Sequence, residues 1–291
     1  MTDHEDSAER WRADLRGTVA VVTGASRGAG RAIALMLGEA GATVYVTGRS
    51  SREGARTEDL PGTVEETAEA VSLRGGTGVA VRCDHSVEAE IAGLFRRVGE
   101  EQGRLDLLVN NAWGGYEGHD VRTFTAPFWE QPGEQRWRGM FTAGVRTHFI
   151  ANRHAAPLML SRRSGLIVAT VAWAFNAYLG SLYYDVAKAA VIRMAFGMAR
   201  ELRPHGVAAV ALAPGFMRTE RVMAAHAAQP FDLSGTESPE YLGRAVAALA
   251  ADPRVLERSG KLLTVGDLAP EYGFTDIDGS RPAAFRLSAD T

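Results

Sequence analysis

The sequence predicts an α/β protein with a doubly wound parallel sheet of about seven strands and helices on both faces. Short β-rich runs alternate with longer helical patterns from Thr18 onward. Most of these runs are continuously apolar, which is typical of strands that helices cover on both sides. The chain also contains 32 glycines, which suit a fold with many tight turns between strands and helices.

The predicted strands follow one another at regular spacing along the chain. They are Thr18–Thr23, Thr43–Thr47, Gly78–Arg82, Leu105–Asn110, Gly165–Val171, Gly206–Ala211 and Lys261–Val265. Helical patterns fill the gaps between them, for instance Gly30–Glu39, Val87–Glu101 and Ala187–Arg203.

The length of 291 residues fits one large domain over 17–291, preceded by a flexible arm over 1–16. The arm is charged and lacks the apolar core of a signal peptide. The regular spacing fails over 112–140 and 215–238. Both segments follow strand ends, where open α/β sheets bind ligands, so we expect lids over a site. The alternative is local packing of aromatic side chains beneath long loops.

Composition excludes several classes of partner. The net charge is −3, with 32 basic and 35 acidic residues, so no broad field favours nucleic acid or an anionic membrane. No apolar run approaches the roughly 20 residues that span a bilayer. Cys83 is the single cysteine, which excludes an intrachain disulfide, and the histidines lack metal-ligand spacing. We expect a cytoplasmic protein that binds a small-molecule substrate and no metal.

A glycine-rich turn ends the first predicted strand and opens directly into a helix. Such a turn brings backbone N–H groups and a helix N-terminus against a pyrophosphate. In this context it predicts a Rossmann-type dinucleotide site. Its phosphate-binding residues are Gly24, Ser26, Arg27, Gly28, Ala29 and Gly30.

The end of the second predicted strand indicates which dinucleotide binds. Enzymes that prefer NAD usually carry an acidic residue there for the ribose hydroxyls. Here the strand runs into Gly48-Arg49-Ser50, with no acid. Arg49, together with Arg27, could clamp a 2′-phosphate, which favours NADP(H). The alternative is that both are solvated surface arginines.

Four motifs in order resemble the short-chain dehydrogenase/reductase family over roughly Leu15 to Leu287. They are the glycine turn, Asn110-Asn111-Ala112, Tyr184-Asp185-Val186-Ala187-Lys188 and Pro214-Gly215-Phe216-Met217-Arg218-Thr219. Within the family the chain is most similar to the branch of dehydrogenase/reductase family member 1. The marks of that branch are Asn110–Gly115, Ser238-Pro239-Glu240 and the tail from Gly266 to Gly279.

The resemblance implies roles by position. Asp84 would bind the adenine ring, Asn111 would lie beside the cofactor, and Pro214, Gly215 and Thr219 would line the nicotinamide. Asp84 could instead cap the next helix, and Pro214-Gly215 could be a plain turn. The resemblance also implies a homodimer or homotetramer, formed through the helices within 134–160 and 187–203.

Tyr184 and Lys188 match the catalytic pair of the family, in which the tyrosine is the acid/base and the lysine binds the cofactor ribose. They lie four residues apart on a predicted helix and therefore share a face. A tyrosine of unperturbed pKa about 10 exchanges protons poorly at neutral pH, and a neighbouring cation lowers that pKa. Lys188 also sits in an Ala-rich apolar helix, which argues against a solvated position.

The chain departs from the family at the polarising serine, thirteen residues before the tyrosine. Val171 stands there and cannot donate a hydrogen bond. Thr170, Ser181 and Asn176 are possible substitutes. The helix asparagine of the family is also replaced, by Gly144.

These observations predict an NADP(H)-dependent oxidoreductase. It would reduce the ketone or aldehyde group of a small to medium apolar substrate, or oxidise the alcohol. The alternative is a redox-silent relative that uses the pocket for proton transfer, dehydration or cyclisation, or that acts as an NADP(H)-responsive binding protein.

Overall fold

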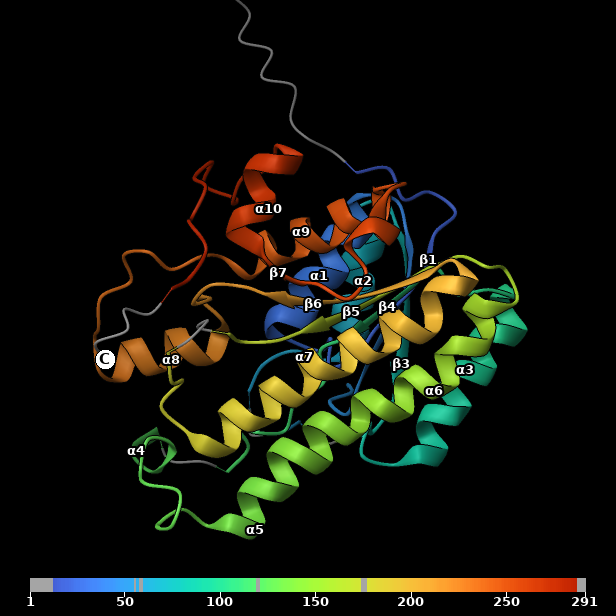
Figure 1. Ribbon diagram of the computed structural model, residues 1–291. Coiled ribbons are helices and arrows are strands. Elements are labelled where there is room, and N and C mark those ends of the chain that lie inside the picture. Colours follow the sequence, from blue (N-terminus) through green and yellow to red (C-terminus); the bar gives the residue numbers. More distant parts are fainter. Residues whose placement is uncertain (1–12, 55, 58–59, 119–120, 174–176, 287–291) are drawn as a thin grey trace, which may run out of the picture.

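One parallel sheet of seven strands runs through the protein in the order β3-β2-β1-β4-β5-β6-β7 (Figure 1). The computed structural model describes residues 13–54, 56–57, 60–118, 121–173 and 177–286. The order confirms the predicted doubly wound fold. The strands are β1 (Val19–Val22), β2 (Thr43–Gly48), β3 (Thr77–Arg82), β4 (Leu107–Asn110), β5 (Gly165–Thr170), β6 (Val207–Ala213) and β7 (Leu262–Thr264).

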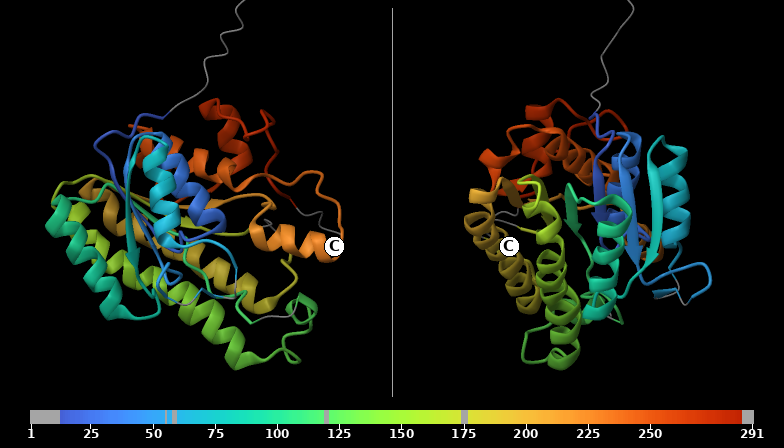
Figure 2. Two further views of the ribbon diagram at one scale, coloured as in Figure 1. Left: turned by 180° about the vertical axis from the view of Figure 1, so that it is seen from behind. Right: turned by 90° about the vertical axis from the view of Figure 1, so that its right-hand side faces the viewer.

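Helices cover both faces of the sheet (Figure 2). One face packs against α1 (Gly28–Glu39), α2 (Val64–Leu73), α9 (Pro239–Ala251) and α10 (Val265–Tyr272). The other packs against α3 (Glu88–Gln102), α6 (Thr147–Leu160) and α7 (Leu182–Leu202). The remaining helical segments are α4 (Val121–Phe124), α5 (Gly133–Arg136), a π-helical stretch (Trp137–Arg146), α8 (Glu220–Ala228) and two 3₁₀ turns (Arg203–His205, Val255–Arg258).

Two apolar cores explain why the strands are continuously apolar. Val22 and Val44 belong to the core beneath α1 and α9, whereas Val21 and Tyr45 belong to the core beneath α3 and α6. Successive side chains of a strand point to opposite faces, so a strand with helices on both sides must be apolar at every position.

The packed domain begins earlier than the sequence predicts. Leu15 is only 2% exposed in the main core, and its backbone N–H donates to the Ala40 carbonyl at 2.7 Å. The predicted arm over 1–16 is therefore too long at its C-terminal end, because the buried Leu15 already belongs to the packed domain. Residues 1–12 lie outside the described part of the chain.

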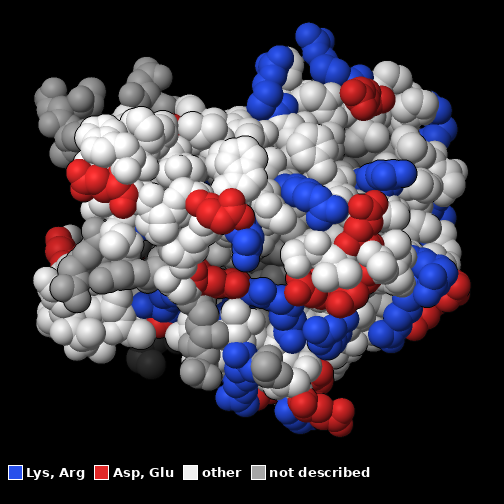
Figure 3. Space-filling model, turned by 90° about the horizontal axis from the view of Figure 1, so that it is seen from below, with Lys and Arg blue, Asp and Glu red and all other residues white. Residues whose placement is uncertain are grey.

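The surface carries no broad field of one sign on the face drawn in Figure 3, where basic and acidic side chains are interspersed. Within the described ranges, no helix is both long enough and apolar enough to cross a lipid bilayer.

The loops after β1 and β4 meet where the strand order reverses. A Cβ built on Gly24 would lie 2.8 Å from the Ala112 Cα. Open α/β sheets bind ligands in the crevice at this point. The predicted lid segments leave the neighbouring strand ends: 112–140 follows β4 and contains α4 and α5, and 215–238 follows β6 and contains α8.

Candidate functional site

The glycine turn is packed so closely that one position admits no side chain. A Cβ on Gly30 would lie 2.3 Å from the Gly24 carbonyl oxygen and 2.5 Å from Asn111 Nδ2. That Asn111 amide donates to the carbonyls of Thr23 and Gly24 at 3.1 and 3.0 Å. Asn111 therefore holds the turn against the end of β4, and the close approach of α1 follows from the absence of a side chain at Gly30.

The start of α1 already binds an anionic group. The Gly28 N–H donates to Glu220 Oε2 at 2.9 Å, and Thr219 lies beside the same glycine. An unpaired N–H at a helix N-terminus attracts negative charge, so the Glu220 carboxylate marks a place that suits a phosphate. Ser26 is buried in the turn, and Ala29 packs against the main core.

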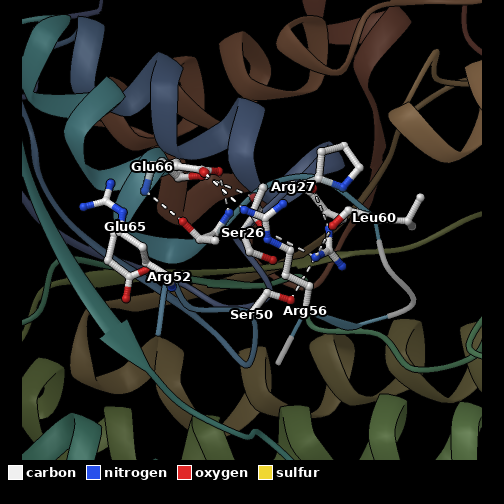
Figure 4. A network of polar contacts seen from close by, with 12 residues as sticks. Ser26, Arg27, Ser50, Arg52, Arg56, Leu60, Glu65 and Glu66 are labelled. Carbon is white, nitrogen blue, oxygen red and sulfur yellow. Dashed lines mark hydrogen bonds and ion pairs between the residues drawn. The ribbon is translucent and has the colours of Figure 1, made fainter. Parts of the chain in front are cut away.

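Arg27 anchors the loop that follows β2 (Figure 4). Its guanidinium donates to Ser50 Oγ at 2.8 Å. It also donates, at 3.0–3.3 Å, to the carbonyls of Thr57, Leu60, Pro61 and Gly62. Arg27 is thus not a solvated surface arginine, because the loop carbonyls accept from its guanidinium. Its contact with a 2′-phosphate stays a prediction.

Arg49 and Asp84 lie together at the ends of β2 and β3. The Arg49 guanidinium forms an ion pair with Glu117, which comes from the segment after β4. Asp84 Oδ1 accepts from the Ser86 N–H at 2.9 Å and from Ser86 Oγ at 2.7 Å, so it caps the turn that leads into α3. The anticipated contact of Asp84 with adenine is not tested by this geometry.

One buried acid, Glu237, supports the loop that begins at Pro214. Gly215 faces Glu237, whose carboxylate oxygen would lie 2.7 Å from a Cβ on that glycine. Burial raises the pKa of Glu237 to about 7. Thr219 ends the loop as the N-cap of α8, where its hydroxyl accepts from the Val222 N–H at 3.4 Å. Pro214-Gly215 is therefore part of a braced loop rather than an isolated turn.

Tyr184 and Lys188 lie on one face of α7 and are 9% and 7% exposed. The Tyr184 hydroxyl is 2.9 Å from the Tyr116 hydroxyl, and its ring meets the Phe124 ring edge-on at 5.4 Å between centroids. Lys188 Nζ lies 3.7 Å from the centroid of the Trp113 ring, a cation–π contact. The four-residue spacing thus brings the pair to one buried spot.

The electrostatics of this pair differ from the expectation. The prediction that the lysine lowers the pKa of Tyr184 is wrong for this structure, because burial raises that pKa well above 10 and the neighbouring Tyr116 raises it further. Burial lowers the pKa of Lys188 to about 7. Lys188 Nζ lies 3.7 Å from the centroid of the Trp113 ring and 5.5 Å from that of the Tyr184 ring, and desolvation of the phenol outweighs any effect of this cation on its pKa.

Two of the three sequence candidates for the missing donor can be placed. Val171 is buried, and Thr170 Oγ1 contacts the Asn110 carbonyl and Asn111 Oδ1, both at 3.3 Å, as the alternation along β5 requires. Ser181 is buried at the start of α7, and its hydroxyl has no hydrogen-bond partner among the described residues. Asn176 lies outside the described part of the chain.

Trp113 explains the glycine that stands in place of the family asparagine. A Cβ on Gly144 would lie 2.6 Å from the Trp113 ring, and one on Gly115 would lie 2.5 Å from the same ring. The indole therefore fits between the π-helical stretch and α7 only because these positions carry no side chain.

Three residues of the site lie outside the sequence assignments. Tyr116 contacts Tyr184, Glu117 contacts Arg49, and Glu220 contacts Gly28. Tyr116 belongs to the predicted lid at 112–140, which was the only signal that could point to it. Glu117 and Glu220 belong to no sequence motif, and only their contacts with Arg49 and Gly28 in the structure place them in the site.

Comparisons with known proteins agree with this architecture. The family model described as "short chain dehydrogenase" matches residues 18–230. Dehydrogenase/reductase SDR family member 1 of Mus musculus is 42% identical over 279 residues, covering 92% of this chain and 85% of the relative. The Homo sapiens protein of that name is 41% identical, covering 95% and 88%. A crystal structure of a putative dehydrogenase from Xanthomonas campestris matches with a TM-score of 0.74 at 26% identity, covering 94% of this chain and 98% of that one.

Proposed function

The chain belongs to the short-chain dehydrogenase/reductase family, and from that premise we propose that it is an NADP(H)-dependent carbonyl reductase. The family implies a nicotinamide dinucleotide as cofactor. The observation that carries the proposal is the buried Tyr184 and Lys188 pair beside the loop that Asn111 fixes. The resemblance to the branch of dehydrogenase/reductase family member 1 is confirmed by the two mammalian relatives.

The residues around the glycine turn fit a dinucleotide. Gly30 leaves room for close backbone approach, and the Gly28 N–H already holds a carboxylate where a phosphate would bind. We assign the pyrophosphate to the turn at 24–30. The loop from Pro214 to Thr219 would hold the nicotinamide end, and Lys188 the adjoining ribose. When bound, the reduced nicotinamide supplies a hydride for the carbonyl carbon.

Tyr184 provides the proton for the carbonyl oxygen. Its raised pKa keeps the phenol protonated at neutral pH, so it can donate a hydrogen bond to a substrate carbonyl and release its proton as negative charge develops there. Its burial excludes water, which strengthens that hydrogen bond. In the reverse direction the same group would accept the proton of an alcohol.

The surroundings of Tyr184 favour an apolar substrate. Aromatic rings of Trp113, Tyr116 and Phe124 lie within 6.0 Å of its ring, measured between centroids. Flat apolar ketones, aryl aldehydes and quinones match such walls, because rings pack edge-on or offset against one another. Anionic substrates would lose hydration without gaining an ionic partner among these rings.

A substrate panel tests the proposal. Purified protein should oxidise NADPH in the presence of at least one apolar ketone, aldehyde or quinone, and it should do so with NADH much more slowly. NADPH binding without consumption across the panel would instead support the redox-silent relative, for which the buried Val171 is the supporting observation.

The choice of NADPH is expected to rest on Arg49. Replacing Arg49 by Gln should lower the preference for NADPH over NADH by about 10- to 100-fold, the worth of a hydrogen bond to a charged group. Glu117→Gln should strengthen NADPH binding, because it removes the carboxylate that pairs with Arg49. Dissociation constants for both cofactors, measured by fluorescence, check the prediction.

Arg52→Gln is the matched control for this change. Arg52 lies three residues further on and pairs with Glu69 on the surface. Its replacement should leave the cofactor preference unchanged. An Arg49→Gln protein that retains the full preference for NADPH would show that another group binds the 2′-phosphate.

A further inference from the structure

A second hydroxyl faces the one that donates the proton. The Tyr116 hydroxyl lies 2.9 Å from that of Tyr184, although the two residues are 68 positions apart in the chain. At the family's serine position this chain has Val171, and Thr170 points to Asn111. Among the described residues, Tyr116 is the hydroxyl that the fold brings into hydrogen-bond contact with Tyr184.

Contacts on several sides hold Tyr116 in place. The Tyr116 ring lies 6.2 Å from each of the Trp113 and Phe124 rings, measured between centroids. The Arg221 guanidinium lies 5.8 Å from the centroid of the Tyr116 ring. The next residue, Glu117, forms the ion pair with Arg49. Its backbone N–H also donates to the Gly114 carbonyl at 3.2 Å. Contacts of Trp113 before it and of Glu117 after it therefore fix the position of the Tyr116 hydroxyl.

The pair of phenols has one donor more than it uses. Each hydroxyl has one hydrogen, and the contact between them uses only one of the two. The other hydrogen has no acceptor among the hydrogen bonds of the described residues. Burial raises the pKa of both phenols, so both hydrogens are present at neutral pH. An oxygen with two lone pairs can accept from both hydroxyls at once.

We propose that Tyr116 is the second hydrogen-bond donor to the substrate carbonyl oxygen and supplies the contact that Val171 cannot make. This rests on the proposed carbonyl reduction. When the substrate binds, its carbonyl oxygen accepts one hydrogen bond from each phenol, and these two bonds replace the one between the phenols. As the hydride adds to carbon, the C=O π electrons move to oxygen, which takes the proton of Tyr184. Tyr116 keeps its proton throughout and stabilises the developing charge.

Tyr116→Phe tests the proposal, because it removes the hydroxyl and keeps the ring. The expected result is a loss of about 10²- to 10³-fold in kcat for the best substrate, with small changes in KM, NADPH affinity and melting temperature. A merely structural role would lower cofactor affinity or melting temperature together with kcat.

Two further variants separate the outcomes. Tyr178→Phe is the matched control, because its side chain is 54% exposed and makes no hydrogen bond or ring contact with either phenol, so its replacement should leave turnover unchanged. Ser181→Ala tests the rival donor. Wild-type kcat in Tyr116→Phe with a large loss in Ser181→Ala would overturn the role of Tyr116 while leaving carbonyl reduction intact. Absence of turnover in the wild type would overturn both.

Discussion

Replacing Tyr184 by Phe is expected to reduce kcat by about 10³-fold, within the 10²- to 10⁴-fold range of a lost general acid. The phenylalanine keeps the ring contacts with Trp113 and Phe124 and removes the hydroxyl, with the proton that the alkoxide needs and the hydrogen bond to Tyr116. NADPH affinity should stay near the wild-type value, because the glycine turn and Arg49 are untouched. Stopped-flow measurement of NADPH oxidation, with cofactor binding measured separately, checks both parts.

Tyr183→Phe provides the comparison for this variant. It makes the same chemical change one residue earlier in α7, where the hydroxyl points to the neighbourhood of Gly133 and not to Tyr116. We expect wild-type kcat from it. Equal losses in the two variants would show that the helix tolerates no change there and that Tyr184 has no special part in the chemistry.

Replacing Gly30 by Ala is expected to have the largest effect on the cofactor site. The new Cβ would lie 2.3 Å from the Gly24 carbonyl oxygen, which is backbone and cannot turn aside. The start of α1 must then move away from β1 and break the amide contacts of Asn111. We expect a loss of about 1–3 kcal/mol in the free energy of unfolding, and NADPH binding weakened by at least about tenfold.

Gly93→Ala is the matched control for stability. Gly93 lies inside α3, and a Cβ there would meet nothing within 4 Å. Alanine should raise the free energy of unfolding by about 0.5–1 kcal/mol, because glycine costs more backbone entropy in a helix. Denaturant titrations and NADPH binding measure both variants. A Gly30→Ala protein as stable as the wild type, with unchanged affinity, would contradict the packing described for the turn.

The fold could be predicted because its signals are local. Most of the strands are mainly apolar along their length, and the strand and helix periods differ enough to separate the elements. The glycine turn and the Tyr184–Lys188 pair can also be recognised from a few neighbouring residues. The misplaced boundary at Leu15 arose because a single buried leucine within a charged segment gives no periodic signal.

The rest of the site depends on contacts between distant parts of the chain. Tyr116 and Tyr184 are 68 residues apart, and Gly28 and Glu220 are 192 apart. Rules based on the spacing of residues within one helix or strand cannot predict such pairs. Arg27 was expected at a phosphate, yet its bonds depend on how the loop after β2 folds back over it. The direction of the Tyr184 pKa likewise depends on burial, which the sequence around it does not give.

Transfer of deuterium from cofactor to product tests the central claim most directly. The wild-type protein would be incubated with NADPH dideuterated at the nicotinamide C4 and with the best apolar ketone of the panel. Mass spectrometry should find one deuterium on the carbinol carbon of the alcohol, and Tyr184→Phe should form that product about 10³-fold more slowly. Unreacted ketone together with tightly bound, still reduced cofactor would contradict the proposal that this protein is a carbonyl reductase.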